Sequence, residues 1–365
     1  MDTAPLLAES DFDGEALKQG IIDWVAMETP SDRPDLIDRL LDKVEADFEG
    51  LSVTRERLPS EGDNGGMLIL RYAPEGATGA PVVMMGHVDT VWATGTLEER
   101  PIRQDGDKLY GPGIYDMKAG SYLATETLRQ LAAEGTPVPR PVVMFLNGDE
   151  ETGSFASRET IESICADAAF VMVPEPSFEA PGTLITSRKG WARFDITAHG
   201  RASHAGGSRD QGRSAIRELA HQTLEIEALN DTEPKASFNV GVFHGGTLRN
   251  VVPAKAHIEV DMRAVDIATA ERLIGAIHGL KPCFPDIELE IEGGLNRPPF
   301  ERTPQVARLY KAITVLARRL QQPMDETTRG GCSDGNFAAA MGRPTIDGLG
   351  CSGCPSSEVL SSSAA

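Results

Sequence analysis

Apolar residues in the first part of the chain form short continuous runs, separated by segments in which apolar residues recur every three or four positions. Residues 82–85, 142–146 and 168–173 are such runs, typical of strands that are buried on both faces. Residues 119–131 carry the apolar stripe of a helix. Strands alternating with helices predict an α/β fold with a mixed sheet flanked by helices, in which functional side chains gather beyond the carboxyl ends of strands.

The pattern changes near residue 188. Residues 191–197 alternate between apolar and polar, as half-exposed antiparallel strands do. A helix, two strands, a helix and a strand are expected next, at residues 212–229, 237–243, 256–263, 267–280 and 287–291. We therefore predict a smaller α+β, ferredoxin-like domain, residues 188–296, inserted into a first domain formed by residues 1–187 and 297–365.

Composition limits the partners. At 365 residues the chain exceeds one typical compact core, which favours two domains. The net charge of −20 argues against nucleic acid and anionic membranes as partners, because both attract basic surfaces. Few, scattered cysteines, no signal-peptide pattern and no apolar run long enough for a membrane span predict a cytoplasmic protein.

Chemically active side chains follow the buried runs. The first run stops at Gly86 and is followed at once by His87, with Asp89 two residues later. Such a pair suits a metal site, because one imidazole nitrogen can bind the ion while the other donates to the carboxylate. The complete set of side chains in such positions is His87, Asp89, Asp116, Glu150, Glu151 and Glu175.

Carboxylates gathered in one cleft repel one another unless cations neutralise them. Imidazole and carboxylate ligands suit zinc, and a shared carboxylate can bridge two ions about 3.5–4 Å apart. The adjacent Glu150 and Glu151 point different ways in an extended loop, so one can bind metal while the other faces the metal-bound water. Any one of these carboxylates, taken alone, is better explained as an exposed loop residue, but that explanation does not suit all of them at strand ends together with His87 and Asp89.

Longer motifs surround these residues, and a resemblance to a known family rests on them. They are Gly86-His87-Val88-Asp89-Thr90-Val91, Tyr110-Gly111-Pro112-Gly113, Asp116-Met117-Lys118-Ala119-Gly120, Asp149-Glu150-Glu151-Thr152-Gly153-Ser154, Glu175-Pro176, Gly200-Arg201-Ala202-Ser203-His204-Ala205-Gly206, Asn250-Val251-Val252-Pro253-Ala254 and Asn296-Arg297-Pro298-Pro299-Phe300. The chain resembles the zinc-dependent amidohydrolase and exopeptidase family that contains glutamate carboxypeptidase, acetylornithine deacetylase, succinyl-diaminopimelate desuccinylase and aminoacylase. The second and last motifs favour the glutamate carboxypeptidase branch.

The resemblance implies a role for each residue of the set. His87 and Glu175 would bind one zinc ion, Glu151 the other, and Asp116 both. The resemblance also implies that Asp89 orients His87. Glu150 is the general base that takes a proton from the metal-bound water and gives it to the leaving amine. The family also has a cis peptide after the bridging aspartate, here Asp116-Met117.

The inserted domain corresponds, by resemblance, to the lid and dimerisation domain of the family. The resemblance implies a homodimer in which His204 and Asn250 reach the active site of the partner subunit. There, His204 would stabilise the oxyanion of the reacting carbonyl group. Arg263 and Arg297 match positions that recognise a carboxylate on a small-molecule or peptide substrate. Surface salt bridges are the alternative for the arginines, and a turn position is the alternative for Asn250.

The sequence departs from the family near its C-terminus. The family closes its second zinc site with a histidine there, whereas Ser357 occupies that position and no histidine follows His278. Two zinc ions per subunit are expected for the family, but the second site is incomplete here. We expect one zinc ion to bind more tightly than the other, and low activity. A frameshifted or truncated gene would account for the difference. A thiolate from Cys351 or Cys354 would complete the second site instead, but two reduced cysteines in the tail are the preferred interpretation of that pair.

The sequence thus predicts a zinc metallo-exopeptidase of the glutamate carboxypeptidase type, cleaving an amide next to a free carboxylate. Two alternatives stay open. One is an N-acyl amino acid deacylase of the acetylornithine or succinyl-diaminopimelate type. The other is a catalytically dead dimeric binding protein that keeps the fold without the missing histidine.

Overall fold

A computed structural model describes residues 12–60, 62, 64–177, 182–319 and 324–352. It divides the chain into two compact units. The described residues up to Ser187, together with Arg302–Thr328 and those from Ser333 onward, form the first unit. Arg188–Glu301 and Arg329–Cys332 form the second unit.

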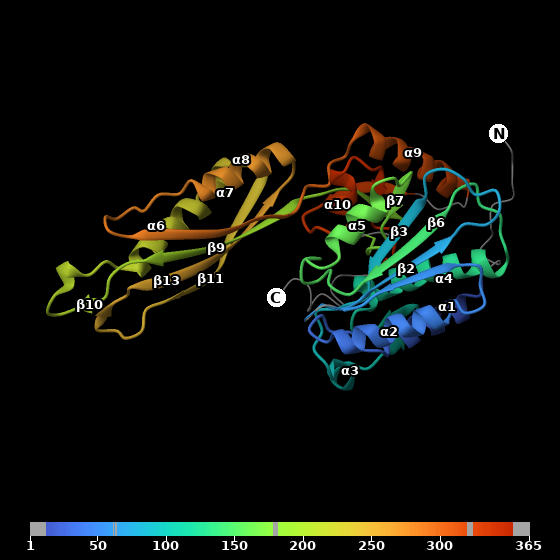
Figure 1. Ribbon diagram of the computed structural model, residues 1–365, viewed down its shortest axis with the longest axis horizontal. Helices are drawn as coiled ribbons and strands as arrows, with labels where there is room; N and C mark the ends of the chain where they lie inside the picture. Colours follow the sequence, from blue (N-terminus) through green and yellow to red (C-terminus); the bar gives the residue numbers. More distant parts are fainter. Residues whose placement is uncertain (1–11, 61, 63, 178–181, 320–323, 353–365) are drawn as a thin grey trace. The chain divides into compact units, whose positions relative to one another are not determined.

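The first unit is built on a six-stranded mixed sheet with the strand order β1-β2-β6-β3-β7-β16 (Figure 1). Strands β6, β3, β7 and β16 are parallel to one another. Strand β2 pairs antiparallel with β6, and β1 pairs antiparallel with β2. The strands are β1 (Thr54–Leu58), β2 (Met67–Tyr72), β3 (Val82–His87), β6 (Val142–Asn147), β7 (Phe170–Met172) and β16 (Thr345–Ile346). The predicted α/β fold with a mixed sheet is therefore confirmed.

Helices cover both faces of this sheet, because consecutive side chains of its central strands are apolar and point to both faces. On one face, Leu70, Met84 and Met144 pack with residues of α1 (Gly14–Val25), α2 (Pro34–Ala46) and α4 (Ala119–Ala133). On the other face, Ile69 and Val83 pack against α5 (Arg158–Cys165) and α10 (Gly335–Ala340). Both faces being buried explains why these strands read as continuous apolar runs.

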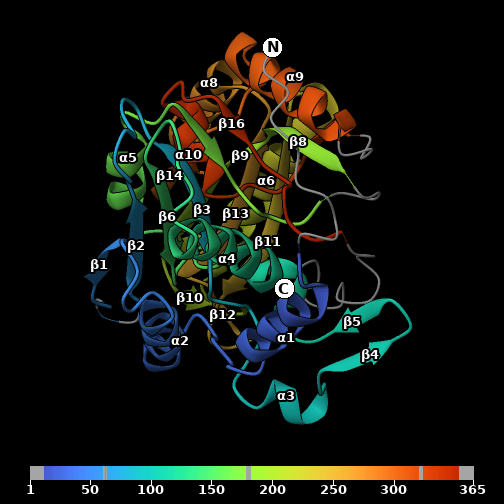
Figure 2. The ribbon, with the colours of Figure 1, turned by 90° about the vertical axis from the view of Figure 1, so that its right-hand side faces the viewer.

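The remaining elements of the first unit lie outside the main sheet. They are α3 (Thr96–Glu99), β4 (Arg103–Asp105), β5 (Lys108–Tyr110), the π-helical segment Ile114–Lys118, β8 (Thr183–Arg188), α9 (Pro304–Arg319) and β15 (Asp325–Arg329). The last residues of β8 and β15, Arg188 and Arg329, already belong to the second unit. Strands β4 and β5 pair only with each other, as a hairpin separate from the main sheet (Figure 2). Every helix in the described part of the chain is too short or too polar to cross a bilayer.

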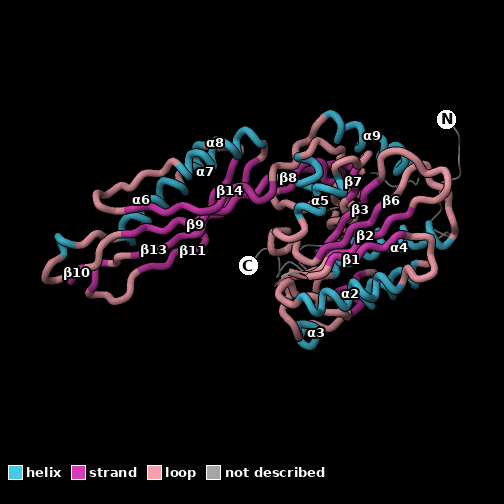
Figure 3. The backbone as a smooth tube through the Cα atoms, viewed as in Figure 1, coloured by secondary structure: helices cyan, strands magenta, loops and turns pink. Residues whose placement is uncertain are grey.

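The second unit contains a four-stranded antiparallel sheet with the order β11-β13-β9-β14 (Figure 3). Its elements are β9 (Gly190–His199), β10 (Ser203–His204), α6 (Ala215–Glu227), α7 (Leu229–Thr232), β11 (Ala236–Gly245), β12 (Val251–Val252), β13 (Lys255–Ala264), α8 (Ile267–His278) and β14 (Glu288–Arg297). This is the predicted ferredoxin-like succession of elements.

Among the described residues, the helices of the second unit pack on one face of its sheet. Phe194 and Ile196 of β9, together with Ile258 and Val260 of β13, pack in a core with Leu219 of α6 and residues of α8. The alternate residues of β9 and β13 are half-buried or exposed on the opposite face. We call that opposite face the open face of the second unit.

The chain returns to the first unit at Arg302, beyond the predicted residue 297. Strand β14 continues to Arg297, which pairs with Trp191, and Phe300 then pairs with Arg188. These backbone hydrogen bonds keep the segment in the second unit. Residues 329–332 also belong there, and Lys189 N donates to Arg329 O.

Candidate metal centre

The parallel strands of the first unit place the predicted ligands at one edge of the sheet. Strand β3 ends at His87, opposite Asn147 at the end of β6, and β7 pairs along the other side of β3. Glu150 and Glu151 follow β6, and Glu175 follows β7. Because carboxyl ends of neighbouring parallel strands meet at the same edge, side chains distant in sequence converge here.

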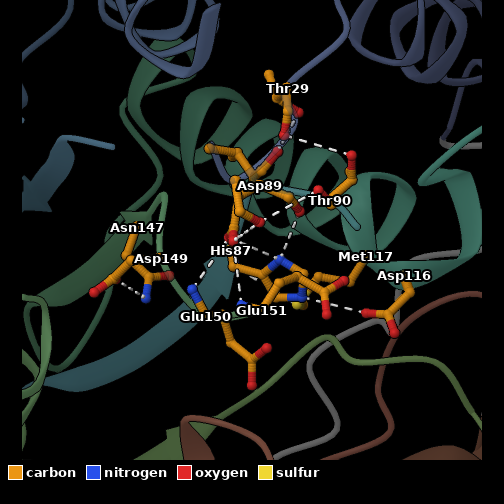
Figure 4. A network of polar contacts seen from close by, with 12 residues as sticks. Thr29, His87, Asp89, Thr90, Asp116, Met117, Asn147, Asp149, Glu150 and Glu151 are labelled. Atoms are coloured by element: carbon orange, nitrogen blue, oxygen red, sulfur yellow. Dashed lines mark hydrogen bonds and ion pairs between the residues drawn. The ribbon is translucent and has the colours of Figure 1, made fainter. Parts of the chain in front are cut away.

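His87 lies at the centre of the cluster and is 1% exposed (Figure 4). Its Nε2 atom lies 3.2 Å from Asp116 Oδ1 and 3.8 Å from Glu175 Oε1. Two atoms that are each about 2.1 Å from a tetrahedral ion lie roughly 3.4 Å apart, so these distances fit ligands around one ion. One ligand atom each from His87, Asp116 and Glu151 also lies within 4.8 Å of the others.

Asp89 holds both His87 and the loop that follows β6. The Nδ1 atom of His87 lies 3.0 Å from the Asp89 carbonyl oxygen and 3.3 Å from its Oδ1. The two carboxylate oxygens of Asp89 also accept hydrogen bonds from the backbone N–H groups of Glu150 and Glu151, at 3.2 and 3.1 Å. Ser31 Oγ donates a further bond of 2.8 Å. The sequence predicted that Asp89 orients His87. It did not predict that Asp89 also fixes the backbone of Glu150 and Glu151.

The charges in the cluster favour a cation. Burial opposes protonation of His87, but hydrogen bonds to Asp116 and Asp89 outweigh it and hold the pKa of His87 well above 6.5. Burial, together with repulsion from Asp116, raises the pKa of Glu151 well above 4.5. In the metal-free protein, protons bound to His87 and Glu151 therefore offset the negative charge of the cluster. A divalent cation would offset the same charge. The donor set and its electrostatics fit a metal ion.

A buried polar network supports the loop after β6. Asn147 Nδ2 donates to Asp334 Oδ2 at 2.8 Å and to Ser157 Oγ at 2.9 Å, and Ser154 Oγ donates to Asp334 Oδ1. Asp149 accepts hydrogen bonds from the backbone N–H groups of residues 156 and 157. Sequence reasoning missed this network, because Asp334 lies far along the chain and no local pattern pairs it with Asn147.

Asp116, the predicted bridging ligand, lies in the irregular helical segment Ile114–Lys118 directly before α4. The peptide bond Asp116-Met117 is cis, as the resemblance implied. Next to it, Lys118 is buried and donates hydrogen bonds to Met27 O at 2.6 Å and Trp24 O at 3.3 Å. Burial lowers the pKa of Lys118 to about 7. Lys118 thereby ties the Asp116 turn to the end of α1, a role that the sequence did not reveal.

In the second unit, the structure supplies a tautomer for His204. Its Nδ1 atom accepts hydrogen bonds from the backbone N–H groups of Gly206 and Gly207, at 3.1 and 3.0 Å. The neutral ring therefore carries its proton on Nε2 and can donate from there. Ala205 N donates to Asn250 O at 2.9 Å, so His204 and Asn250 lie in neighbouring segments of this unit.

Arg263 and Arg297 lie on either side of Trp191. Arg263 of β13 and Arg297 of β14 both pair with Trp191 of β9, which aligns the three residues across the sheet. The Arg263 guanidinium lies 5.3 Å from the Trp191 ring centroid and donates two hydrogen bonds of 2.8 Å to Asp261. Arg297 is buried. The alternative interpretation of Arg263, an ion pair, is thus present in the structure, and its role towards a substrate stays a prediction.

The structure describes only part of the C-terminal segment in which the sequence departs from the family pattern. Cys351 packs beside a small apolar cluster of Val25, Ile114 and Ala119. Cys354 and Ser357 lie outside the described residues. The set of ligands at the second metal position therefore stays as predicted from the sequence.

Comparison with known proteins identifies relatives along most of the chain. The sequence profile of Peptidase family M20/M25/M40 matches residues 83–360. Carboxypeptidase G2 of Pseudomonas sp. (strain RS-16) is 28% identical over an alignment covering 96% of this chain and 89% of that protein. Acetylornithine deacetylase of Myxococcus xanthus is 30% identical, covering 83% of this chain and 78% of that protein.

A solved structure shows the same fold. The YXEP protein of Bacillus subtilis, described as a dinuclear metal-binding peptidase from the M20 family, matches with a TM-score of 0.62. The alignment covers 91% of this chain and 88% of that chain at 15% identity. Together, the matches confirm the family predicted from the sequence motifs and identify a hydrolase of the metallopeptidase and amidohydrolase class.

Proposed function

Because the chain belongs to Peptidase family M20/M25/M40, we propose that it cleaves an amide bond next to a free carboxylate, in the manner of a glutamate carboxypeptidase. The observation that carries this choice is the alignment of Arg263 and Arg297 across Trp191. Guanidinium groups are suited to carboxylates, with which they form paired, charge-assisted hydrogen bonds. The substrate is a small molecule or peptide ending in such a carboxylate.

The proposed metal is zinc. His87 and Glu175 would hold one ion, Glu151 a second, and Asp116 would contact both. Zinc in such a site polarises a carbonyl group and lowers the pKa of water towards about 7. The Glu151 position would be the weaker of the two, because Ser357 stands where the family has a histidine ligand.

The residues of the chain then supply binding, orientation and proton transfer. Asp89 holds the His87 ring and fixes the backbone of the loop that carries Glu150. Glu150 takes the proton from the attacking water and delivers it to the leaving amine. In the proposed homodimer, the partner subunit's His204 donates from Nε2 to the oxyanion that develops on the carbonyl.

A panel of substrates tests this proposal. N-acyl glutamates should be hydrolysed with a kcat/KM at least about tenfold above that for N-acetylornithine or N-succinyl-diaminopimelate, since each factor of ten requires about 1.4 kcal/mol of discrimination. A preference for N-acetylornithine would make the protein a deacylase instead. Absence of turnover on every substrate, with measurable binding of N-acyl glutamates, would make it a binding protein.

The size of the protein in solution and its zinc content complete the test. A dimer by light scattering is expected, and a monomer would exclude the role given to His204 of the partner subunit. Dialysed protein should retain one zinc ion firmly and lose the second on further dialysis. The cytoplasmic location suggested by the cysteines stays a prediction.

A further inference from the structure

A second group of metal-ligating side chains lies on the open face of the second unit. It consists of Asp195 on β9 with His257 and Glu259 on β13. One ligand atom from each lies within 4.8 Å of the others. This group shares no residue with the centre around His87, and its residues have no part in the proposed reaction.

The register of the sheet explains why these three side chains meet. Asp195 and Glu259 are direct partners across β9 and β13. His257 precedes Glu259 by two positions, so both side chains leave β13 on the same face. The helix-covered face is occupied by the alternate residues, such as Ile258 and Val260. Two strands of a continuous antiparallel sheet therefore hold the group in place.

The distances resemble those of the first centre. His257 Nε2 lies 3.4 Å from Asp195 Oδ1 and 3.9 Å from Glu259 Oε1. The corresponding contacts of His87 Nε2 are 3.2 and 3.8 Å. Two ligands of one tetrahedral ion lie roughly 3.4 Å apart, so small side-chain adjustments would complete the geometry.

The other ring nitrogen of His257 also has a suitable partner. Its Nδ1 atom lies 3.1 Å from Thr197 Oγ1, the neighbouring residue on the same face of β9. A hydrogen bond at Nδ1 keeps Nε2 available to an ion and fixes the orientation of the ring. In addition, His244 of β11 pairs directly with His257 across the sheet, which brings a second imidazole to this face.

We propose that Asp195, His257 and Glu259 form a surface site for a divalent transition metal of the zinc and cobalt class. One imidazole and two carboxylates are ligands that these ions accept, and solvent would complete the coordination. His257 is 30% exposed, so the ion exchanges with solvent and stabilises the sheet of the second unit without entering the reaction.

Metal counting on the full chain tests the proposal. The His257→Asn chain should bind one cobalt or zinc ion fewer than the unchanged chain at saturation, measured by equilibrium dialysis and elemental analysis. Asp195→Asn and Glu259→Gln, which alter different strands, should weaken the same ion. Thr197→Val should weaken it about tenfold, as loss of a hydrogen bond to a ligand does.

His199→Asn is the matched control. His199 lies on the same face of β9, but it contacts only one carboxylate in the described structure, with Nε2 2.9 Å from Glu290 Oε2. This variant should keep the full metal complement. Equal metal content in His257→Asn and unchanged protein would overturn the proposal, as would an equal loss in His199→Asn. The count is independent of turnover, so its failure is distinguishable from failure of the proposed function.

Discussion

The centre around His87 and the group around His257 use similar ligands at similar spacing, but in different surroundings. His87 is 1% exposed at the ends of parallel strands, whereas His257 is 30% exposed in the middle of an antiparallel sheet. Asp89 accepts backbone hydrogen bonds from Glu150 and Glu151 beside the first histidine, while Thr197 makes a single contact with the second. Spacing alone therefore suggests a metal ion, and burial and hydrogen bonding decide whether that ion can do chemistry.

The largest expected difference between the two regions is in catalysis. Glu150→Gln should lower kcat by about 100- to 10,000-fold, the usual contribution of a general base, while leaving the metal content unchanged. Glu259→Gln, the matched change at the second group, should leave kcat unaltered. Steady-state kinetics on an N-acyl glutamate measures both, and equal losses would remove the distinction between the regions.

Removing the hydrogen-bond partner of each histidine should affect metal affinity differently in the two regions. Asp89→Asn should weaken metal binding at the first centre about 10- to 100-fold, because both the His87 ring and the Glu150-Glu151 backbone lose a charged acceptor. Thr197→Val should affect only the ion at His257, by about tenfold or less. Competition with a chromophoric chelator gives both affinities. A larger loss of metal affinity in Thr197→Val than in Asp89→Asn would contradict the conclusion that the buried centre is the more strongly supported of the two.

The pH dependence should reveal the first centre in metal-free protein. The raised pKa values of His87 and Glu151 mean that the folded state binds more protons than the unfolded state. These contributions to stability are complete below the ordinary values of 6.5 and 4.5 and are lost as the pH rises through the raised values. Up to about pH 7, the pKa of Lys118, thermal unfolding in chelator should therefore occur at lower temperature as the pH increases. Above that pH, the lowered pKa of Lys118 acts in the opposite direction.

Metal binding should show the opposite dependence on pH. An ion that displaces one proton binds about tenfold more tightly for each unit of pH increase. Calorimetric titration in buffers of different ionisation enthalpy measures the protons released. The His87→Asn chain is the control, and an unchanged proton release in that chain would contradict the assignment to His87.

The smallest expected effects concern packing around two helical glycines. A Cβ atom on Gly120 of α4 would overlap the carbonyl oxygen of Pro174, next to Glu175. Gly120→Ala should therefore cost about 1–3 kcal/mol of unfolding free energy, as overpacking does. Gly275→Ala in α8, with no atom within 4 Å of the added carbon, should stabilise by about 0.4–1 kcal/mol. Urea unfolding distinguishes the two signs.

Much of the first centre could be predicted because its signals are local. The apolar runs ending at His87 and before Glu150 define strands, and parallel strands bring their ends together. The contacts of Asp89 with the next loop, and of Asp334 with Asn147, join residues far apart in sequence and have no local pattern. The return at residue 302 was missed for the same reason, since a bridge between Phe300 and Arg188 determines it.

The group around His257 was missed for a different reason. In the sequence, His257 and Glu259 are ordinary polar positions of an alternating strand. Only the pairing of β13 with β9 brings Asp195 to them. Alternation predicts the face on which a side chain lies, but not its neighbour on the next strand, because register depends on the whole sheet.

The inserted arrangement of the second unit also sets an order of events on the ribosome, where chains grow from the N-terminus. His87, Asp116, Glu151 and Glu175 are all translated before Arg188, the first residue of the second unit. Strand β16, which completes the sheet beside β7, is translated only after the whole insertion. The nascent chain thus presents its predicted metal ligands while one edge of their supporting sheet is still missing, and a longer insertion prolongs that interval.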